Sequence, residues 1–145
     1  MGLDMYLQAK KSVFGSPYAD KENQKMYKKL AKLFPLDTGE EKGLTISFTV
    51  GYWRKANQIH KWFVDNVQGG VDNCGEYYVP REELEQLKQL CETKNYLALP
   101  PQEGFFFGGT ERDEWYYAQL ADTLSILERV LDYPGEWSFY YSSSW

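Results

Sequence analysis

The stretch from residue 44 to residue 67 changes from an alternating pattern to a helical one within a few positions. Ile46, Phe48 and Val50 recur at every second residue, which is the period of a strand with one buried face. A stripe with helical spacing follows directly and comprises Ala56, Ile59, Phe63 and Val67. A strand that leads straight into an amphipathic helix favours a sheet with helices packed against it.

The other periodic segments extend this pattern along the whole chain. We predict strands over residues 2–13, 44–52 and 136–141, with a short extended piece at 77–79. We predict helices over residues 20–34, 54–68, 80–94 and 111–132. Pro35 should end the first helix before a polar loop at 37–43, and Thr110 with Asp113 has the spacing of a capping box for the last. The expected fold is therefore α+β, a small antiparallel or mixed sheet packed by three to four helices, in a single domain over 1–145.

Composition excludes several classes of protein. A formal net charge of -5 argues against non-specific binding of nucleic acid, which needs a basic surface. Cys74 and Cys91 form no metal-ligand spacing with the single histidine, so we expect free thiols, no metal and no cofactor. No apolar run approaches membrane-spanning length and the first residues lack a signal-peptide pattern, so we expect a soluble cytoplasmic protein.

A basic and aromatic segment around the central predicted helix is the first candidate site. Trp53 and Arg54 open the segment, and Arg54, Asn57 and Lys61 are spaced to share one helical face. Arginine offers a planar fork to a phosphate and lysine a point charge, while tryptophan can stack on a base. The alternative is an amphipathic helix whose basic face is merely solvated.

Three further features have both a functional and a structural interpretation. His60 could act in acid–base chemistry, but the sequence fixes no nucleophile or carboxylate beside it, which favours a structural histidine. Phe107 and Gly108 precede a helix and could bring backbone N–H groups to a phosphate, or could simply form a turn. Trp115 lies in an aromatic run that should meet the sheet or a ligand. An acidic cluster, Glu111 with Asp113 and Glu114, is explained by the helix dipole without catalysis.

Several motifs together resemble a family of small, uncharacterised proteins encoded by bacteriophages and prophages. The motifs are the start Met1-Gly2-Leu3-Asp4-Met5-Tyr6-Leu7, Val50-Gly51-Tyr52-Trp53-Arg54-Lys55-Ala56-Asn57, Ile59-His60-Lys61-Trp62-Phe63, Asp72-Asn73-Cys74 and Gly104-Phe105-Phe106-Phe107-Gly108. The similarity spans most of the chain except about residues 10–43. It implies a setting, an accessory phage protein acting in the bacterial host cytoplasm, but it supplies no activity and no catalytic residue.

These observations favour a binding protein that captures a small nucleotide-like anion, such as a host immune signal, and so counters host defence. The candidate ligand-binding residues are Trp53, Arg54, Asn57, His60, Lys61, Phe107, Gly108 and Trp115. We assign no catalytic residue and expect a homo-oligomer, because pockets of this kind are often built between subunits. Two alternatives stay open. One is a protein–protein inhibitor of a host defence protein, and the other a small nucleotide hydrolase using His60 or the acidic cluster.

Overall fold

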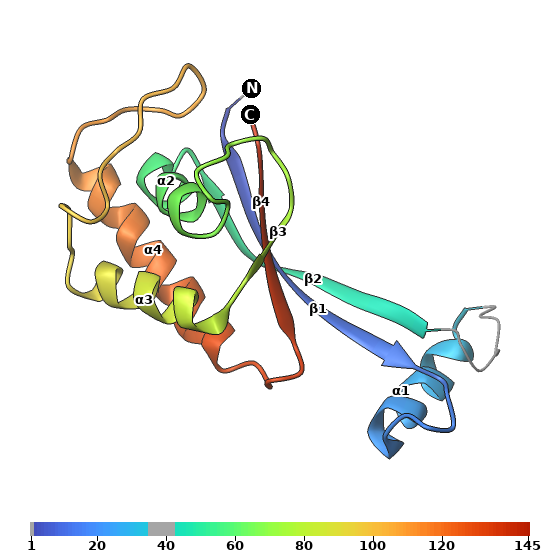
Figure 1. The fold of residues 1–145 in the computed structure, drawn as a ribbon. Helices are drawn as coiled ribbons and strands as arrows, with labels where there is room; N and C mark the ends of the chain where they lie inside the picture. The colour runs from blue at the N-terminus through green and yellow to red at the C-terminus, as the bar shows by residue number, and fades with distance from the viewer. Residues whose placement is uncertain (1, 35–42) are drawn as a thin grey trace. The chain divides into compact units, whose positions relative to one another are not determined.

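The computed structural model describes residues 2–34 and 43–145, and within them four strands and four helices (Figure 1). The strands are β1 (Asp4–Phe14), β2 (Gly43–Arg54), β3 (Tyr77–Val79) and β4 (Ser138–Ser144). The helices are α1 (Lys21–Ala31), α2 (Asn57–Asn66), α3 (Arg81–Glu92) and α4 (Glu114–Leu131). None of these helices has the length and apolarity needed to cross a bilayer.

The strands form one antiparallel sheet in the order β2-β1-β4-β3. The short strand β3 pairs with β4, with Tyr77 opposite Tyr141 and Val79 opposite Phe139. The first and last strands of the chain are therefore neighbours at the centre of the sheet, and the expected α+β class with an antiparallel sheet is confirmed.

The described residues divide into two compact units, one of residues 2–9 and 49–145 and a smaller one of residues 10–34 and 43–48. In the smaller unit, Asp20 caps α1 by accepting a hydrogen bond from the backbone N–H of Asn23 at 2.9 Å. Phe48 exposes 53% of its surface there, so the strand's alternating residues do not all enter a core. Pro35 and nearly all of the loop predicted at 37–43 lie outside the described residues, and cooperative folding as a single domain stays a prediction.

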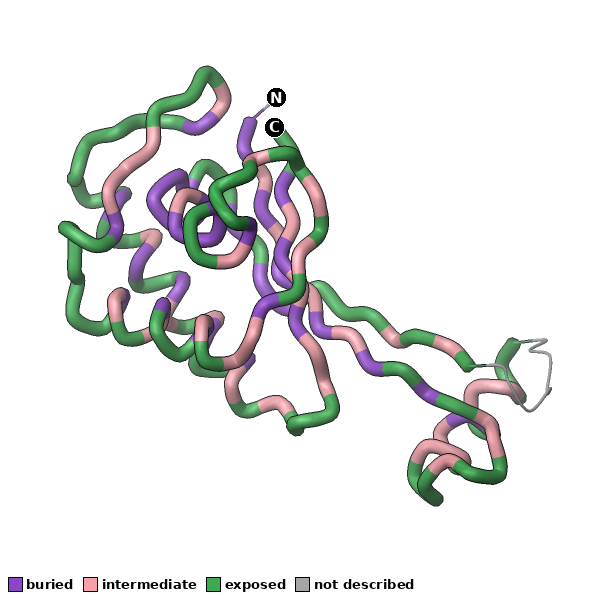
Figure 2. The backbone as a smooth tube through the Cα atoms, in the orientation of Figure 1, coloured by how far each residue is buried: buried purple, intermediate pink, exposed green. Residues whose placement is uncertain are grey.

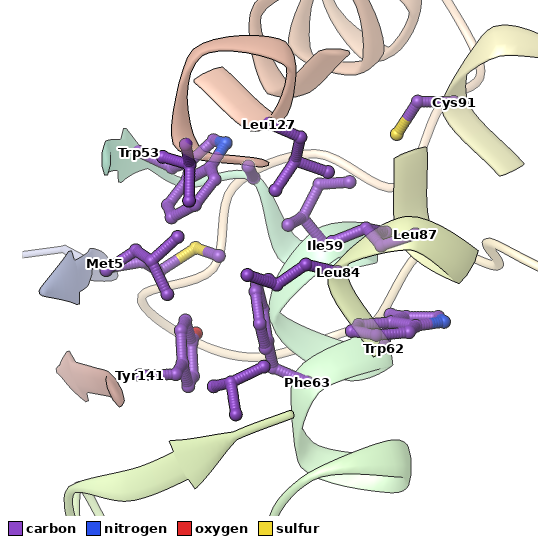
Figure 3. Close-up of a cluster of buried hydrophobic side chains, with 14 of the residues drawn as sticks. Met5, Trp53, Ile59, Trp62, Phe63, Leu84, Leu87, Cys91, Leu127 and Tyr141 are labelled. Carbon is purple, nitrogen blue, oxygen red and sulfur yellow. The ribbon is translucent and has the colours of Figure 1, made fainter. Parts of the chain in front are cut away.

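In the larger unit, α2, α3 and α4 lie on one side of the sheet (Figure 1) and share a single hydrophobic core with it. Met5 from β1, Ile59 from α2 and Leu84 from α3 are fully buried in that core (Figure 3). The rings of Phe63 and Tyr141 stack at 3.9 Å between centroids, with planes 7° apart, which fixes α2 against β4.

The central helix α2 is shorter than predicted and buried along most of its length (Figure 2). It begins at Asn57 rather than at residue 54, because Lys55 has a φ of 56°, which no right-handed helix accommodates. Helix α2 ends at Asn66, two residues before the predicted end at residue 68, and Gly69 and Gly70, with φ of 62° and 79°, turn the chain after it. Arg54 is consequently a strand residue, and the helical face expected to carry Arg54, Asn57 and Lys61 together does not exist.

The boundaries of the last two elements also differ from the prediction. Helix α4 is capped by Asp113 itself, whose side chain accepts from the N–H of Tyr116 at 3.1 Å, so the Thr110-based box is wrong. Aspartate is a stronger N-cap than threonine, which explains the later start. Strand β4 continues to Ser144, three residues beyond the predicted end, because Ser143 extends the alternation of buried residues.

Truncating Ile59 should destabilise the fold, because its side chain is completely buried among the helices and the sheet. We expect Ile59→Ala to lower the free energy of unfolding by roughly 2–5 kcal/mol through the cavity it leaves. Lys61→Ala, which removes only a partly exposed ion pair with Asp65, should cost less than about 1 kcal/mol. Denaturant unfolding of the two variants measures both values, and equal losses would contradict this division of α2 into a packing side and a solvent side.

Candidate functional site

The candidate site begins where the chain passes from β2 into α2. The Lys55 backbone is left-handed there, and its N–H donates to the carbonyl of Leu3 at 2.8 Å. The Lys55 carbonyl accepts from Nε2 of Gln119 on α4 at 3.3 Å. A left-handed non-glycine residue costs on the order of 1–3 kcal/mol and persists only where its surroundings fix it. These two bonds, one to the residue before β1 and one from α4, hold the turn that positions the side chains of Arg54 and Lys55.

The segment before α4 packs directly on this turn. Gly108 has a φ of 89°, and a Cβ built on it would lie 3.2 Å from Cβ of Lys55. Glycine therefore serves both the backbone conformation and the close approach at this position. The side chain of Asn57 holds the same segment. Its Nδ2 donates to the carbonyls of Phe107 at 3.1 Å and Gly109 at 2.8 Å.

A pocket of ≈ 400 Å³ opens between these segments. This volume lies in the range of ligand-binding pockets, about 300–1,000 Å³. The lining residues come from the β2–α2 junction, the segment before α4, and the first turns of α4. They are Arg54, Lys55, Gln58, Gly108, Gly109, Glu111, Asp113, Trp115, Tyr116 and Gln119.

Two cations converge at one edge of the pocket. A Cβ built on Gly2 would lie 3.1 Å from Cε of Lys55 and 3.7 Å from Nη2 of Arg54, so both side chains pass over the same glycine. Within the described part of the chain, no carboxylate forms an ion pair with either. Neighbouring like charges repel, so an anion placed between them would be stabilised.

The aromatic residues of the pocket differ in their exposure. Trp115 exposes 76% of its surface, which leaves its indole face available to a ligand. Tyr116 is buried, and its hydroxyl donates to the carbonyl of Leu99 at 2.7 Å. Burial raises the pKa of the Tyr116 phenol, so this hydroxyl stays a hydrogen-bond donor at neutral pH.

Of the eight residues predicted for the site, Arg54, Gly108 and Trp115 line the pocket. Trp53 lies in the core instead, where its indole N–H donates to the Thr123 hydroxyl at 2.9 Å. Asn57 and Phe107 are buried behind the pocket wall and support it without lining it.

His60 and Lys61 lie outside the residues that line the pocket. His60 is fully buried, with Nδ1 2.7 Å from the Tyr141 hydroxyl and Nε2 2.9 Å from a carboxylate oxygen of Asp72. Burial raises the pKa of Tyr141 well above its ordinary value, so the hydroxyl can donate to Nδ1 and leaves Nε2–H to Asp72. Both ring nitrogens are therefore occupied, as in a structural histidine. Lys61 pairs with Asp65 at 2.9 Å, one turn further along α2.

Sequence reasoning missed most of the polar lining of the pocket. Lys55 follows Arg54 directly, but its role depends on a left-handed turn that periodicity does not reveal. Gln58 and Gln119 each immediately precede a residue of an apolar stripe, and a polar residue at the edge of such a stripe is the signal that could have marked them. Glu111 and Asp113 were not among the predicted ligand-binding residues, because the helix dipole explains them, yet both line the pocket.

Within residues 2–34 and 43–145, no group of histidine, cysteine and carboxylate side chains is arranged to hold a metal ion. Comparison of the chain with protein-family models, with curated proteins and with solved structures gives no match. The chemistry of the pocket must therefore be inferred from its own residues.

Asn57 should be essential to the pocket wall, because its Nδ2 and Oδ1 together make three hydrogen bonds to the segment that precedes α4. Asn57→Asp keeps the shape and the acceptor for the Gln102 N–H but presents an anion to two carbonyls. We expect a loss of at least about 1–3 kcal/mol of stability, the cost of leaving a buried polar group unsatisfied. Denaturant unfolding measures the loss, and an unchanged midpoint would show that these bonds do not hold the wall.

The two thiols should differ sharply in reactivity. Burial raises the pKa of Cys91 to about 12, whereas Cys74 is exposed. Because the thiolate is the reactive form, a thiol reagent at neutral pH should label Cys74 rapidly and Cys91 only after unfolding. Mass spectrometry of native and denatured samples counts the labels. Rapid labelling of both thiols in the native protein would contradict the burial of Cys91.

Proposed function

We propose that this protein captures a small nucleotide-like anion in the pocket between the β2–α2 junction and the start of α4. The observation that carries the proposal is the convergence of Arg54 and Lys55 over Gly2, at the edge of the pocket and without a carboxylate partner among the described residues. An arginine fork and a lysine point charge form strong charge-assisted hydrogen bonds to a phosphate.

The pocket also offers a platform for a planar group. Trp115 lines the pocket and exposes most of its ring, and stacking of a base on an aromatic side chain contributes roughly 1–3 kcal/mol. A phosphate and a base are two of the three parts of a nucleotide, which supports this class of ligand over a simple inorganic anion.

The biological role that we propose is counter-defence in a bacterial host, with the captured nucleotide a host immune signal. This part of the proposal depends on the resemblance of the sequence motifs to phage and prophage proteins. Capture requires tight binding without turnover, in the host cytoplasm. We further propose that the protein acts as a homo-oligomer, which is testable by light scattering.

A second candidate function is inhibition of a host defence protein through an aromatic surface. The observation in its favour is the exposure of Phe105, which leaves 96% of its surface open, close in sequence to Trp115. Phenylalanine and tryptophan are enriched in protein–protein interfaces relative to the rest of the surface. The hydrolase alternative through His60 has no such support, since this side chain is sealed in the core with both ring nitrogens bonded.

Removing the guanidinium of Arg54 should weaken nucleotide binding by about 1.5–3 kcal/mol, the range for hydrogen bonds to charged groups. Stability should change by about 0.5 kcal/mol or less, because Arg54 is exposed at the end of β2. Isothermal calorimetry of Arg54→Ala against a panel of linear and cyclic nucleotides measures the first effect, and thermal melting the second.

Lys61→Ala is the matched control, because it removes a cation from α2 that does not line the pocket. It should bind the panel as the wild type does. If the wild type binds no nucleotide, or Arg54→Ala binds as tightly as wild type, the capture proposal is wrong and the inhibitor function becomes the better explanation.

A further inference from the structure

The pocket contains a pair of glutamine side chains whose hydrogen bonds fix their orientation. Gln58 is 1% exposed, and its Nε2 donates to the carbonyl of Tyr116 at 3.3 Å and to Oε1 of Gln119 at 2.9 Å. Turning this amide over would set its oxygen against the Tyr116 carbonyl, so the assignment of nitrogen and oxygen follows from the partners.

The fixed amide leaves an acceptor without a protein donor. Both N–H groups of Gln58 are used, while Oε1 makes no hydrogen bond within the described part of the chain. Oε1 of Gln58 is not among the fully buried side-chain atoms that lack a hydrogen-bond partner, so it is not completely enclosed by protein. Gln58 lines the pocket, which is where a ligand could reach this oxygen. A residue this deeply buried with an unused acceptor favours a ligand that brings its own N–H donor.

Of the other polar side chains of the pocket, Glu111 and Asp113 also offer acceptors to a ligand that carries an N–H donor. Oε1 of Gln119 accepts from Gln58, and one N–H of its Nε2 donates to the Lys55 carbonyl, which leaves a single N–H for a ligand. Glu111 and Asp113 can accept hydrogen bonds but cannot donate them when they are ionised, and one Asp113 oxygen already accepts from the Tyr116 N–H. Away from the two cations, the acceptors of the lining are Oε1 of Gln58 and the carboxylates of Glu111 and Asp113, and the side-chain donors are one N–H of Gln119 and the indole N–H of Trp115.

We infer that the ligand is a nucleotide whose base carries an exocyclic amino group, as in adenine, guanine or cytosine, an inference that rests on the proposed function. The phosphate lies with Arg54 and Lys55, and the amino group donates to Oε1 of Gln58 or to a carboxylate of Glu111 or Asp113. A base that replaces the amino group with a carbonyl, as in hypoxanthine or uracil, sets an acceptor against these acceptors.

Matched pairs of nucleotides test the inference. Inosine and uridine replace the amino group of adenosine and cytidine with a carbonyl and carry a proton on the adjacent ring nitrogen, whereas inosine differs from guanosine only in lacking its 2-amino group. Calorimetry with the wild-type protein compares adenosine with inosine monophosphate, guanosine with inosine monophosphate, and cytidine with uridine monophosphate. We expect the amino-bearing member of at least one pair to bind about 10- to 100-fold more tightly, the ratio that a hydrogen bond to a charged or buried acceptor supports.

Glu111→Gln provides the variant, because it keeps the shape of an exposed side chain while replacing one acceptor oxygen with a donor. It should reduce the preference for the amino-bearing nucleotide and leave folding unchanged. Glu114→Gln, an exposed acid in the first turn of α4 outside the pocket lining, is the matched control and should keep the wild-type ratio.

The outcomes separate this inference from the function on which it rests. If both members of every pair bind equally and depend on Arg54, nucleotide capture holds and the preference for an amino group is wrong. If no nucleotide binds at all, both are wrong. An amino preference that survives in Glu111→Gln assigns the recognition to Gln58 or Asp113, whereas an equal loss in Glu114→Gln would overturn the local assignment.

Discussion

The buried side chain of Asn57 is the interaction on which the candidate site depends. It belongs to the first turn of α2, yet it accepts from the backbone N–H of Gln102 at 3.0 Å and donates to two carbonyls further along the same segment. That segment has no regular secondary structure between Gln102 and Arg112, so it has no ladder or helical bonds of its own to fix it. The Asn57 amide therefore adds three bonds to the two backbone bonds of this segment, from the Leu3 N–H to the Phe106 carbonyl and from the Phe107 N–H to the Gly104 carbonyl, and it sets the wall of the pocket against the helix.

A second buried polar cluster, centred on His60 of α2, differs from the Gln58 side chain in how its hydrogen bonds are satisfied. His60 joins Tyr141 of β4 to Asp72, and the second carboxylate oxygen of Asp72 accepts from the Trp145 indole at 3.1 Å. Every member of that cluster has a partner, which makes it a structural tie. The Gln58 amide differs because one of its atoms is left over, and only such an atom indicates a ligand.

The sequence predicted the elements well because most of them have a strong apolar period. The stripe through Ile59 and Phe63 and the alternation around Met5 both identify elements that the structure contains. The site was predicted less well because it depends on the left-handed turn at Lys55, which has no periodic signature. The helix starts at Asn57, three residues later than predicted, so the three residues assigned to one helical face are separated. Arg54 lies at the end of β2, Asn57 is buried and bonded to the segment before α4, and Lys61 forms a partly exposed ion pair with Asp65.

The left-handed backbone at Lys55 gives the protein a trade-off between robustness and charge. Glycine or asparagine adopts this conformation at lower cost than lysine, so either would relieve conformational strain at the turn. The same replacement would delete one of the two cations that converge over Gly2. Substituting Lys55 with glycine or asparagine to raise thermal stability would therefore weaken the attraction of the pocket for an anion, because one position determines both properties.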